Sequence, residues 1–307
     1  MTTTAPAALT SAATDVGTGL REGYADLGDV RLHYVEAGNG PLVVLLHGFP
    51  EFWYGWRQQI APLVKAGFRA VAPDLRGYNL SSRPDDFSGY TADKLAADVR
   101  GLIRELGAQS AMVVGHDWGG TVAWTLAMNH PEVVDRLAIL NAAHPRRLNE
   151  GLRNPRQLSR SWYFFYFQFP RLPEHHARAQ RWRFLKRFLR DARPPYTAEQ
   201  LDRYVEAWSR PGAAKAMIDY YRAAVRLGSK QGELRPVAAP TLVIWGQADR
   251  YLGPKLAEPH HDDVPNLDRV ERLPNASHWV HHDEADRVNE LLLGFFAPVR
   301  ERESGRT

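Results

Sequence analysis

The segment 111–128, with the sequence AMVVGHDWGGTVAWTLAM, constrains the fold of this chain more than any other stretch. It opens with an apolar run at 112–114, which is long enough for one buried strand and too short for a helix. From Thr121 onward the apolar residues recur as they do on one face of a helix. Glycines stand on both sides of the intervening turn, where a side chain would collide with the strand or the helix. The sequence therefore predicts a strand, a sharp turn and a helix, with Asp117 at the tip of the turn.

An aspartate at this tip has two interpretations. It can be an N-cap, whose side chain accepts hydrogen bonds from the first turn of the helix. It can also be a nucleophile, because a carboxylate is ionised at neutral pH and can attack an sp3 carbon, which leaves an alkyl-enzyme ester. The hexapeptide GHDWGG favours neither interpretation by itself, so the choice depends on the rest of the chain.

Short apolar runs alternate with helical patterns through most of the sequence. Strands are predicted at 30–36, 42–46, 70–74, 112–114, 136–140, 241–246 and 267–273, and helices at 56–66, 90–106 and 285–296, with the second helix capped by Thr91. The run at 42–46 is continuously apolar, as in strands that are covered on both faces. Regular alternation of strand and helix predicts a mostly parallel, doubly wound α/β sheet.

This pattern stops at His144 and resumes near residue 237. The intervening segment has helical patterns and no strong strand, and 146–235 contains 20 Lys+Arg residues against 8 Asp+Glu. We therefore predict an α/β core at 23–144 and 237–299, interrupted by a helical cap at 145–236.

Composition excludes several other classes of protein. The chain has no cysteine, which rules out disulfides and thiol nucleophiles, and no apolar run approaches the roughly 18 residues that span a bilayer. The basic segment carries no nucleic-acid motif, and its amphipathic stretch 181–190 is interpreted as a helix packed on its own domain and not as a membrane helix. Residues 1–22 are small, polar and aperiodic, so we expect a disordered N-terminal segment, no signal peptide and a cytoplasmic protein.

Two later residues stand where partners of a nucleophile are needed. Asp249 follows the strand at 241–246, and His278 lies in the loop before the last helix. Their order after Asp117, an acid and then a histidine, is the chain order that such an elbow requires. Asn141 occupies the other position where an acid could lie, but an amide cannot stabilise an imidazolium by charge. We therefore predict a catalytic triad of Asp117, Asp249 and His278.

Two further features bear on the chemistry. The backbone N–H groups of Phe49 and Trp118 are expected to stabilise an oxyanion on Asp117. His278, His281 and His282 have a spacing that is compatible with metal binding, but no carboxylate or fourth ligand accompanies them in sequence. We expect no metal and no cofactor.

Over 24–296 the chain resembles an α/β-hydrolase-fold epoxide hydrolase, a family that is related to the haloalkane dehalogenases. The resemblance rests on HGFPEFWYGWRQQI, APDLRGYNLSSRP, GHDWGG, SWYFFYFQFPRLPE, IDYYRAA, IWGQADRYL and ASHWVHH. It implies an eight-stranded, mostly parallel sheet with a helical cap. It also implies two cap tyrosines that protonate the epoxide oxygen, and these match Tyr163 and Tyr221; Tyr220 and Tyr166 are weaker candidates.

The resemblance implies a two-step reaction. Asp117 attacks the epoxide, and water activated by the His278–Asp249 pair then hydrolyses the ester to a vicinal diol. Substrate contacts are expected from His47, Pro50, Trp118 and Phe167. The implied partners are a small apolar epoxide and water, with no nucleic acid and no membrane, and the protein is expected to be a monomer or a homodimer.

Two alternatives remain open at this stage. A haloalkane dehalogenase uses the same fold and nucleophile, but that family usually has asparagine where Phe49 stands, and Phe49 and the two cap tyrosines favour the epoxide hydrolase. A non-catalytic binding protein could retain the fold as a ligand sensor, although an intact triad argues against this class.

Overall fold

Eight strands form one sheet in the order β1-β2-β4-β3-β5-β6-β7-β8 in the computed structural model, which describes residues 19–228 and 234–304. The strands are β1 (Arg21–Asp26), β2 (Arg31–Ala37), β3 (Leu42–Leu46), β4 (Arg69–Pro73), β5 (Ala111–His116), β6 (Val134–Leu140), β7 (Thr241–Gly246) and β8 (Leu267–Leu273). The pairs β1–β2 and β2–β4 are antiparallel, and the remaining pairs are parallel. The predicted fold class, a mostly parallel eight-stranded α/β sheet, is confirmed.

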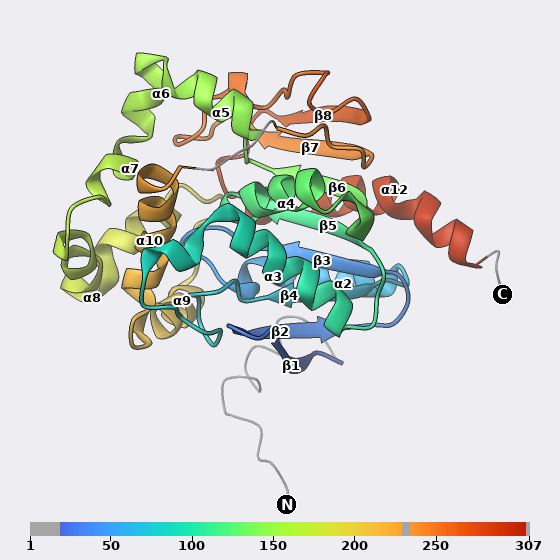
Figure 1. Cartoon of the computed structure of the whole chain (residues 1–307), viewed down its shortest axis with the longest axis horizontal. Helices are drawn as coiled ribbons and strands as arrows, with labels where there is room; N and C mark the ends of the chain where they lie inside the picture. The colour runs from blue at the N-terminus through green and yellow to red at the C-terminus, as the bar shows by residue number, and fades with distance from the viewer. Residues whose placement is uncertain (1–18, 229–233, 305–307) are drawn as a thin grey trace, which may run out of the picture.

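The central strands are apolar because helices cover them on both sides. Every residue of β3, β5 and β7 is buried, whereas β8 at the edge is mostly half-buried or exposed and carries charged side chains. The core helices are α2 (Arg57–Lys65), α3 (Ala92–Glu105), α4 (Trp118–Asn129), α11 (Val280–Asp283) and α12 (Ala285–Ser304), and the short 3₁₀ turns are η1 (Trp53–Trp56), η2 (Phe87–Tyr90), η3 (Pro131–Val133) and η4 (Pro254–Leu256). In Figure 1, α3 and α4 lie in front of the sheet.

The cap consists of helices that lie beside one end of the sheet (Figure 1). They are α5 (Pro145–Leu152), α6 (Pro155–Arg160), α7 (Trp162–Tyr166), α8 (Leu172–Leu189), α9 (Ala198–Ser209) and α10 (Ala213–Arg226). All of them follow β6 and precede β7, as the interruption of the strand pattern predicts.

The amphipathic stretch 181–190 differs from its prediction at its beginning. Residues 179–182 have non-helical backbone angles, so the regular helix begins after Trp182 and not at Arg181. This break allows the Trp182 ring to be buried near Trp208 of α9 (ring centroids 6.1 Å apart). Leu185 and Leu189 are buried, so this apolar face packs within the protein.

The N-terminal prediction is wrong at its last two residues. Residues 1–18 lie outside the described residues, but Arg21 and Glu22 belong to β1, which the sequence analysis did not predict. Ala25 is the one fully buried residue of this edge strand, so β1 lacks a clear period of apolar residues. Within the described ranges no helix is both long and apolar enough to cross a membrane.

Candidate active site

The turn between β5 and α4 is strained at Asp117, which has φ of 51° and ψ of −118°. A residue other than glycine adopts such angles at a cost of about 1–3 kcal/mol, and does so where its surroundings hold it in place. Asp117 occupies the N-cap position of α4, but its side chain makes no capping hydrogen bond. The carboxylate is therefore free for other partners, and the N-cap interpretation has no support in the structure.

Close backbone approach explains the glycines around this turn. A Cβ on Gly119 would collide with the carbonyl oxygen of Leu46, at the end of β3. A Cβ on Gly48 would collide with the side chain of Asp117 itself. The missing side chains thus let the loop after β3 pass directly over the Asp117 carboxylate.

This loop supplies one of the two predicted oxyanion donors. The backbone N–H of Phe49 donates to Asp117 Oδ1 over 2.8 Å. Trp118 is the first residue of α4, and the first N–H groups of a helix have no partner within the helix. The Phe49 amide therefore contacts the Asp117 carboxylate, and the Trp118 amide as a second oxyanion donor stays a prediction.

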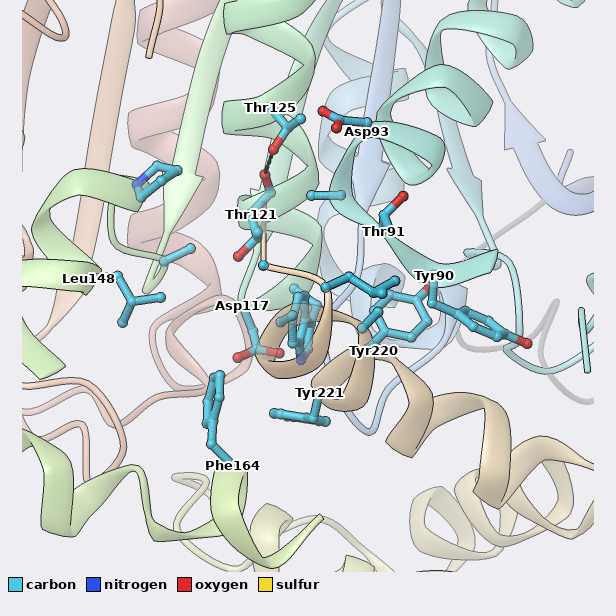
Figure 2. Close-up of a pocket in the computed structure, with 18 of the residues that line it drawn as sticks. Tyr90, Thr91, Asp93, Asp117, Thr121, Thr125, Leu148, Phe164, Tyr220 and Tyr221 are labelled. Carbon is cyan, nitrogen blue, oxygen red and sulfur yellow. Dashed lines mark hydrogen bonds between the residues drawn. The ribbon is translucent and has the colours of Figure 1, made fainter. Parts of the chain in front are cut away.

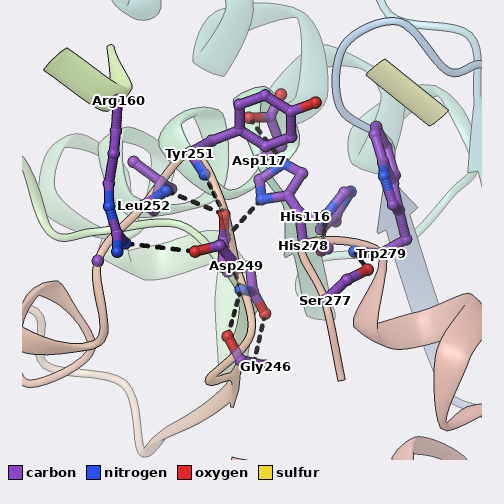
Figure 3. A network of polar contacts seen from close by, with 12 residues as sticks. His116, Asp117, Arg160, Gly246, Asp249, Tyr251, Leu252, Ser277, His278 and Trp279 are labelled. Atoms are coloured by element: carbon purple, nitrogen blue, oxygen red, sulfur yellow. Dashed lines mark hydrogen bonds and ion pairs between the residues drawn. The ribbon is translucent and has the colours of Figure 1, made fainter. Parts of the chain in front are cut away.

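The structure brings His278 to the other oxygen of Asp117 and Asp249 to the far nitrogen of the His278 ring (Figure 3). His278 Nε2 lies 3.4 Å from Asp117 Oδ2, and His278 Nδ1 lies 2.7 Å from Asp249 Oδ2. Asp249 also accepts hydrogen bonds from the Tyr251 and Leu252 amides and from Asn141 Nδ2, at 2.7, 2.9 and 2.7 Å. Asn141, the residue considered as an alternative acid, thus supports Asp249.

Electrostatics in this triad favour the ion pair. Burial opposes the charged form of His278, but the carboxylates of Asp249 and Asp117 outweigh it and raise the His278 pKa to about 10. Burial likewise opposes ionisation of Asp249, but His278 and the hydrogen bonds to the carboxylate lower its pKa. His278 in the free protein is therefore an imidazolium held between two carboxylates.

Two tyrosines of the cap, Tyr163 and Tyr221, line the same cavity as Asp117. Figure 2 shows Tyr221 beside Asp117. Tyr163 lies on α7 and Tyr221 on α10, with ring centroids 5.6 Å apart. Burial and the nearby Asp117 carboxylate raise the pKa of both phenols well above 10. Both hydroxyls are consequently protonated at neutral pH and available as donors.

The two weaker tyrosine candidates have other partners. Tyr220 donates to the carbonyl oxygen of Arg76 over 2.7 Å. The Tyr166 hydroxyl lies 2.8 Å from His176 Nδ1, and Tyr166 does not line the cavity. This arrangement favours Tyr163 and Tyr221 as the pair above Asp117.

Three residues that were expected to contact substrate lie behind the cavity wall. His47 Nε2 accepts from the Leu75 amide at 3.0 Å, the Pro50 carbonyl oxygen accepts from Trp208 Nε1 at 2.6 Å, and Phe167 packs against Phe49. All three are buried and none lines the cavity, whereas Trp118 does. The HGFP loop presents its backbone and not its side chains to Asp117, so we assign His47, Pro50 and Phe167 a supporting role.

The sequence analysis missed a buried cluster beside the triad. Glu51 Oε2 lies 3.3 Å from His116 Nδ1 and 3.2 Å from His281 Nε2. His116 Nε2 in turn lies 2.9 Å from the backbone oxygen of His278, and Tyr204 of the cap donates to Glu51 Oε1 over 2.9 Å. The sequence offered one signal: Glu51 directly follows HGFP, and His116 directly precedes Asp117. No spacing rule, however, predicts a contact between residues that are more than 60 positions apart.

This cluster is also the group of described side chains that could hold a metal ion. The ligand atoms of Glu51, His116 and His281 lie within 4.8 Å of one another. The three histidines with metal-like spacing do not converge: His278 pairs with Asp249, His281 faces Glu51, and His282 Nδ1 lies 2.8 Å from Arg57 Nη2. The expectation of a site without metal stays a prediction.

Comparison with known proteins gives consistent results. Residues 41–285 match the family model of the α/β hydrolase fold. The chain is 42% identical over 282 residues to a Bacillus subtilis AB hydrolase superfamily protein (90% of this chain, 98% of the relative). It is also 38% identical over 285 residues to mouse epoxide hydrolase 4 (89% and 78%).

Solved structures show the same likeness. A mutant epoxide hydrolase from Bacillus megaterium, in complex with its product (R)-3-[1]naphthyloxy-propane-1,2-diol, superposes with a TM-score of 0.81 at 33% identity, covering 90% of this chain and all of that one (100%). Epoxide hydrolase A from Mycobacterium thermoresistibile superposes with a TM-score of 0.80 at 31% identity, covering 91% and 98%.

Proposed function

The chain belongs to the α/β-hydrolase fold family and is one of its epoxide hydrolases, and from this premise we propose that Asp117 opens the epoxide ring as a covalent nucleophile. The observation that carries the proposal is that the two oxygens of the Asp117 carboxylate have different partners. Oδ1 accepts a hydrogen bond from the Phe49 amide, and Oδ2 lies near His278. Asp117 itself lines the cavity.

Ring opening requires a nucleophile on one side of the epoxide and a proton donor on the other. Oδ2 attacks a ring carbon, the bond from that carbon to the epoxide oxygen breaks, and that oxygen takes a proton from Tyr163 or Tyr221. A neutral phenol suits this step because a poor alkoxide leaving group needs a donor as charge develops. The raised pKa values of Tyr163 and Tyr221 keep that proton in place until the ring opens.

Ester hydrolysis then regenerates the enzyme. Esterification removes the negative charge of Asp117, one of the two carboxylates that raise the His278 pKa, so the imidazole becomes easier to deprotonate. The imidazolium first gives its proton to the tyrosinate that ring opening leaves. Neutral His278 then takes a proton from water, and the hydroxide attacks the ester carbonyl carbon. The Phe49 and Trp118 amides stabilise the resulting oxyanion. As the intermediate collapses, the diol leaves with the former Oδ2 and takes the proton of the new Asp117 carboxyl group. The Asp117 carboxylate, the His278 imidazolium and both neutral tyrosines are then restored.

A substrate panel tests the proposed function directly. We expect diol release from styrene oxide and from aryl glycidyl ethers; the latter are chosen because the Bacillus megaterium relative holds a naphthyloxy diol. Alkyl bromides serve as the comparison, since dehalogenation would release bromide from them. Bromide release without diol release from any epoxide would contradict the proposal and favour the dehalogenase chemistry.

A further inference from the structure

The outer edge of the cap exposes a row of large apolar side chains. Figure 1 shows α7 and α8 on the side of the cap that faces away from the sheet. On α7, Trp162 is 49% exposed and Phe165 is 56% exposed. Further along the chain, Phe169 is 56% exposed and Leu172 is 52% exposed. The half-buried ring of Tyr166 connects the row, since its centroid lies 5.8 Å from that of Trp162 and 6.5 Å from that of Phe169.

We call Trp162, Phe165, Phe169 and Leu172 the apolar row. None of the four lines the cavity at Asp117, so the proposed reaction does not account for them. Single exposed apolar side chains are ordinary, but neighbouring ones of this size mark a surface that binds a protein or a membrane. The charge of the surrounding segment distinguishes between such partners.

The segment that carries the apolar row is strongly basic. Residues 151–190 contain ten Lys+Arg residues and one acidic residue, Glu174, which pairs with Arg222 of α10 over 2.5 Å. All nine arginines of this segment are exposed, and none forms an ion pair with a carboxylate in the described parts of the chain. They are Arg153, Arg156, Arg160, Arg171, Arg178, Arg181, Arg183, Arg187 and Arg190. Such a surface attracts an anionic partner and repels a second copy of itself.

Exposed apolar side chains together with unpaired arginines suit a lipid surface. Aromatic rings enter the boundary between headgroups and acyl chains, and basic side chains attract anionic headgroups. An aliphatic side chain such as Leu172 gains from contact with lipid, but it offers no ring on which a nucleic-acid base could stack. A bilayer is also fluid, so it accepts protruding side chains without a groove of matching shape.

We propose that the apolar row and the arginines of 151–190 dock the protein on an anionic phospholipid surface. The contact is peripheral, with the side chains of the row in the headgroup boundary. It places α7, whose Tyr163 and Phe164 line the cavity, beside the layer in which apolar compounds dissolve. This inference goes beyond the proposed function and does not depend on it, because binding to lipid is measured without an epoxide.

The proposal departs from the expectation that the protein has no membrane partner. That expectation concerned the amphipathic stretch 181–190, whose apolar residues Leu185 and Leu189 are buried. The apolar row lies earlier in the cap. Its exposure could not be recognised in the sequence, because Tyr163 and Phe167, which are also aromatic and stand between its members, are buried.

Co-sedimentation of the full-length protein with vesicles tests the docking surface. One set of vesicles contains equimolar phosphatidylcholine and phosphatidylserine, and the other contains phosphatidylcholine alone. We expect binding to the mixed vesicles to be about tenfold tighter or more, and to weaken as the salt concentration rises. No binding to the mixed vesicles, or equal binding to both sets, would overturn the proposal.

A double variant of the apolar row tests its contribution. Phe165→Ser combined with Phe169→Ser removes two exposed rings and should weaken binding to the mixed vesicles by about tenfold or more. Thermal unfolding checks that the variant is folded. Unchanged binding of the folded variant would show that the row does not enter the lipid, and would contradict the proposal.

A second double variant tests the arginines. Arg171→Gln combined with Arg178→Gln should weaken binding by about tenfold or more, since a basic side chain near an anionic surface contributes about fivefold. Lys65→Gln combined with Arg104→Gln is the matched control, because it removes the same net charge from exposed positions of the core helices α2 and α3. The control should bind as wild type. Equal losses in the two variants would mean that net charge alone drives binding, and the docking surface would be wrong.

Two further measurements address other occupants of the same surface. A dimer in lipid-free solution that the Phe165→Ser, Phe169→Ser variant dissociates, seen by analytical ultracentrifugation, would assign the apolar row to a second copy of the chain. Tighter binding to a single-stranded oligonucleotide than to the mixed vesicles, unaffected by the same variant, would assign the arginines to a nucleic acid. Either result would overturn the proposal and leave the proposed function untouched.

Discussion

The core and the cap meet at Asp117, and they bring different kinds of side chain to it. The core contributes ionised groups: the Asp117 and Asp249 carboxylates and the His278 imidazolium. The cap contributes neutral hydroxyls, Tyr163 and Tyr221, and aromatic rings. Backbone amides of the core donate hydrogen bonds to the Asp117 and Asp249 carboxylates. The Tyr163 and Tyr221 phenols of the cap line the cavity. This difference agrees with the proposed mechanism, in which the core makes and breaks the ester while the cap assists the departing oxygen.

The largest effect is expected from the core base. His278→Gln should lower steady-state turnover by roughly 10⁴-fold, because ester hydrolysis loses its general base. Ring opening should persist, so mass spectrometry should find the substrate's mass added to the peptide that contains Asp117. His261→Gln, which changes an exposed histidine, is the control and should behave as wild type. If His278→Gln showed full turnover and no adduct, His278 would not be the base that hydrolyses the ester.

A somewhat smaller effect is expected from the cap. Tyr163→Phe and Tyr221→Phe should each slow ester formation by about 10²-fold, and the double variant should lose ring opening almost completely. Stopped-flow tryptophan fluorescence during one turnover measures this step, since Trp118 lies against Tyr221. The control is Tyr166→Phe, a cap tyrosine outside the cavity. Wild-type rates in the double variant would show that the cap plays no chemical role.

Stability offers a third comparison, at the boundary between core and cap. Glu51→Gln should lower the free energy of unfolding by about 2 kcal/mol, since it removes the charged hydrogen-bond partner of two buried histidines. Glu258→Gln breaks an exposed ion pair with Arg272 and should cost less than about 1 kcal/mol. Chemical denaturation measures both. Equal losses in the two variants would mean that the buried cluster does not stabilise the fold.

The smallest expected effect is a change in the His278 pKa when Asp117 loses its charge. The His278 pKa is raised to about 10 in the folded protein, so its stabilisation is fully present below about pH 6.5 and is lost as pH rises through about 10. Asp117→Asn imitates the neutral ester and removes one of the two raising carboxylates. An NMR titration of the imidazole should therefore give a lower His278 pKa in Asp117→Asn than in wild type. An unchanged value would show that esterification does not prepare His278 to act as a base.

Features of the core were the easiest to predict from the sequence. Continuous apolar runs such as 42–46 identify central strands because both faces are covered, and the predicted bounds match β3. Asp117, Asp249 and His278 were found because each follows a strand, and parallel strands end at one edge of a sheet. The roles of these residues, like those of Tyr163 and Tyr221, stay predictions.

Long-range contacts limited the remaining predictions. The strand β1 was not predicted because an edge strand buries few side chains. The helix break at 179–182 was not predicted either, and its last residue, Trp182, contacts the distant Trp208. Glu51 was overlooked because its partners lie 65 and 230 residues further along the chain, at His116 and His281. The direction of the HGFP loop, backbone toward Asp117, likewise depends on its packing against the elbow.

The most direct test of the covalent mechanism is a single turnover in H₂¹⁸O with enzyme in excess over an epoxide. Hydrolysis of an ester on Asp117 places the labelled oxygen in the Asp117 carboxylate, and the first diol carries the unlabelled former Oδ2. Mass spectrometry of the peptide that contains Asp117 should therefore show the ¹⁸O, with none in the first diol. Label that appears directly in the diol, with an unlabelled Asp117, would contradict the mechanism.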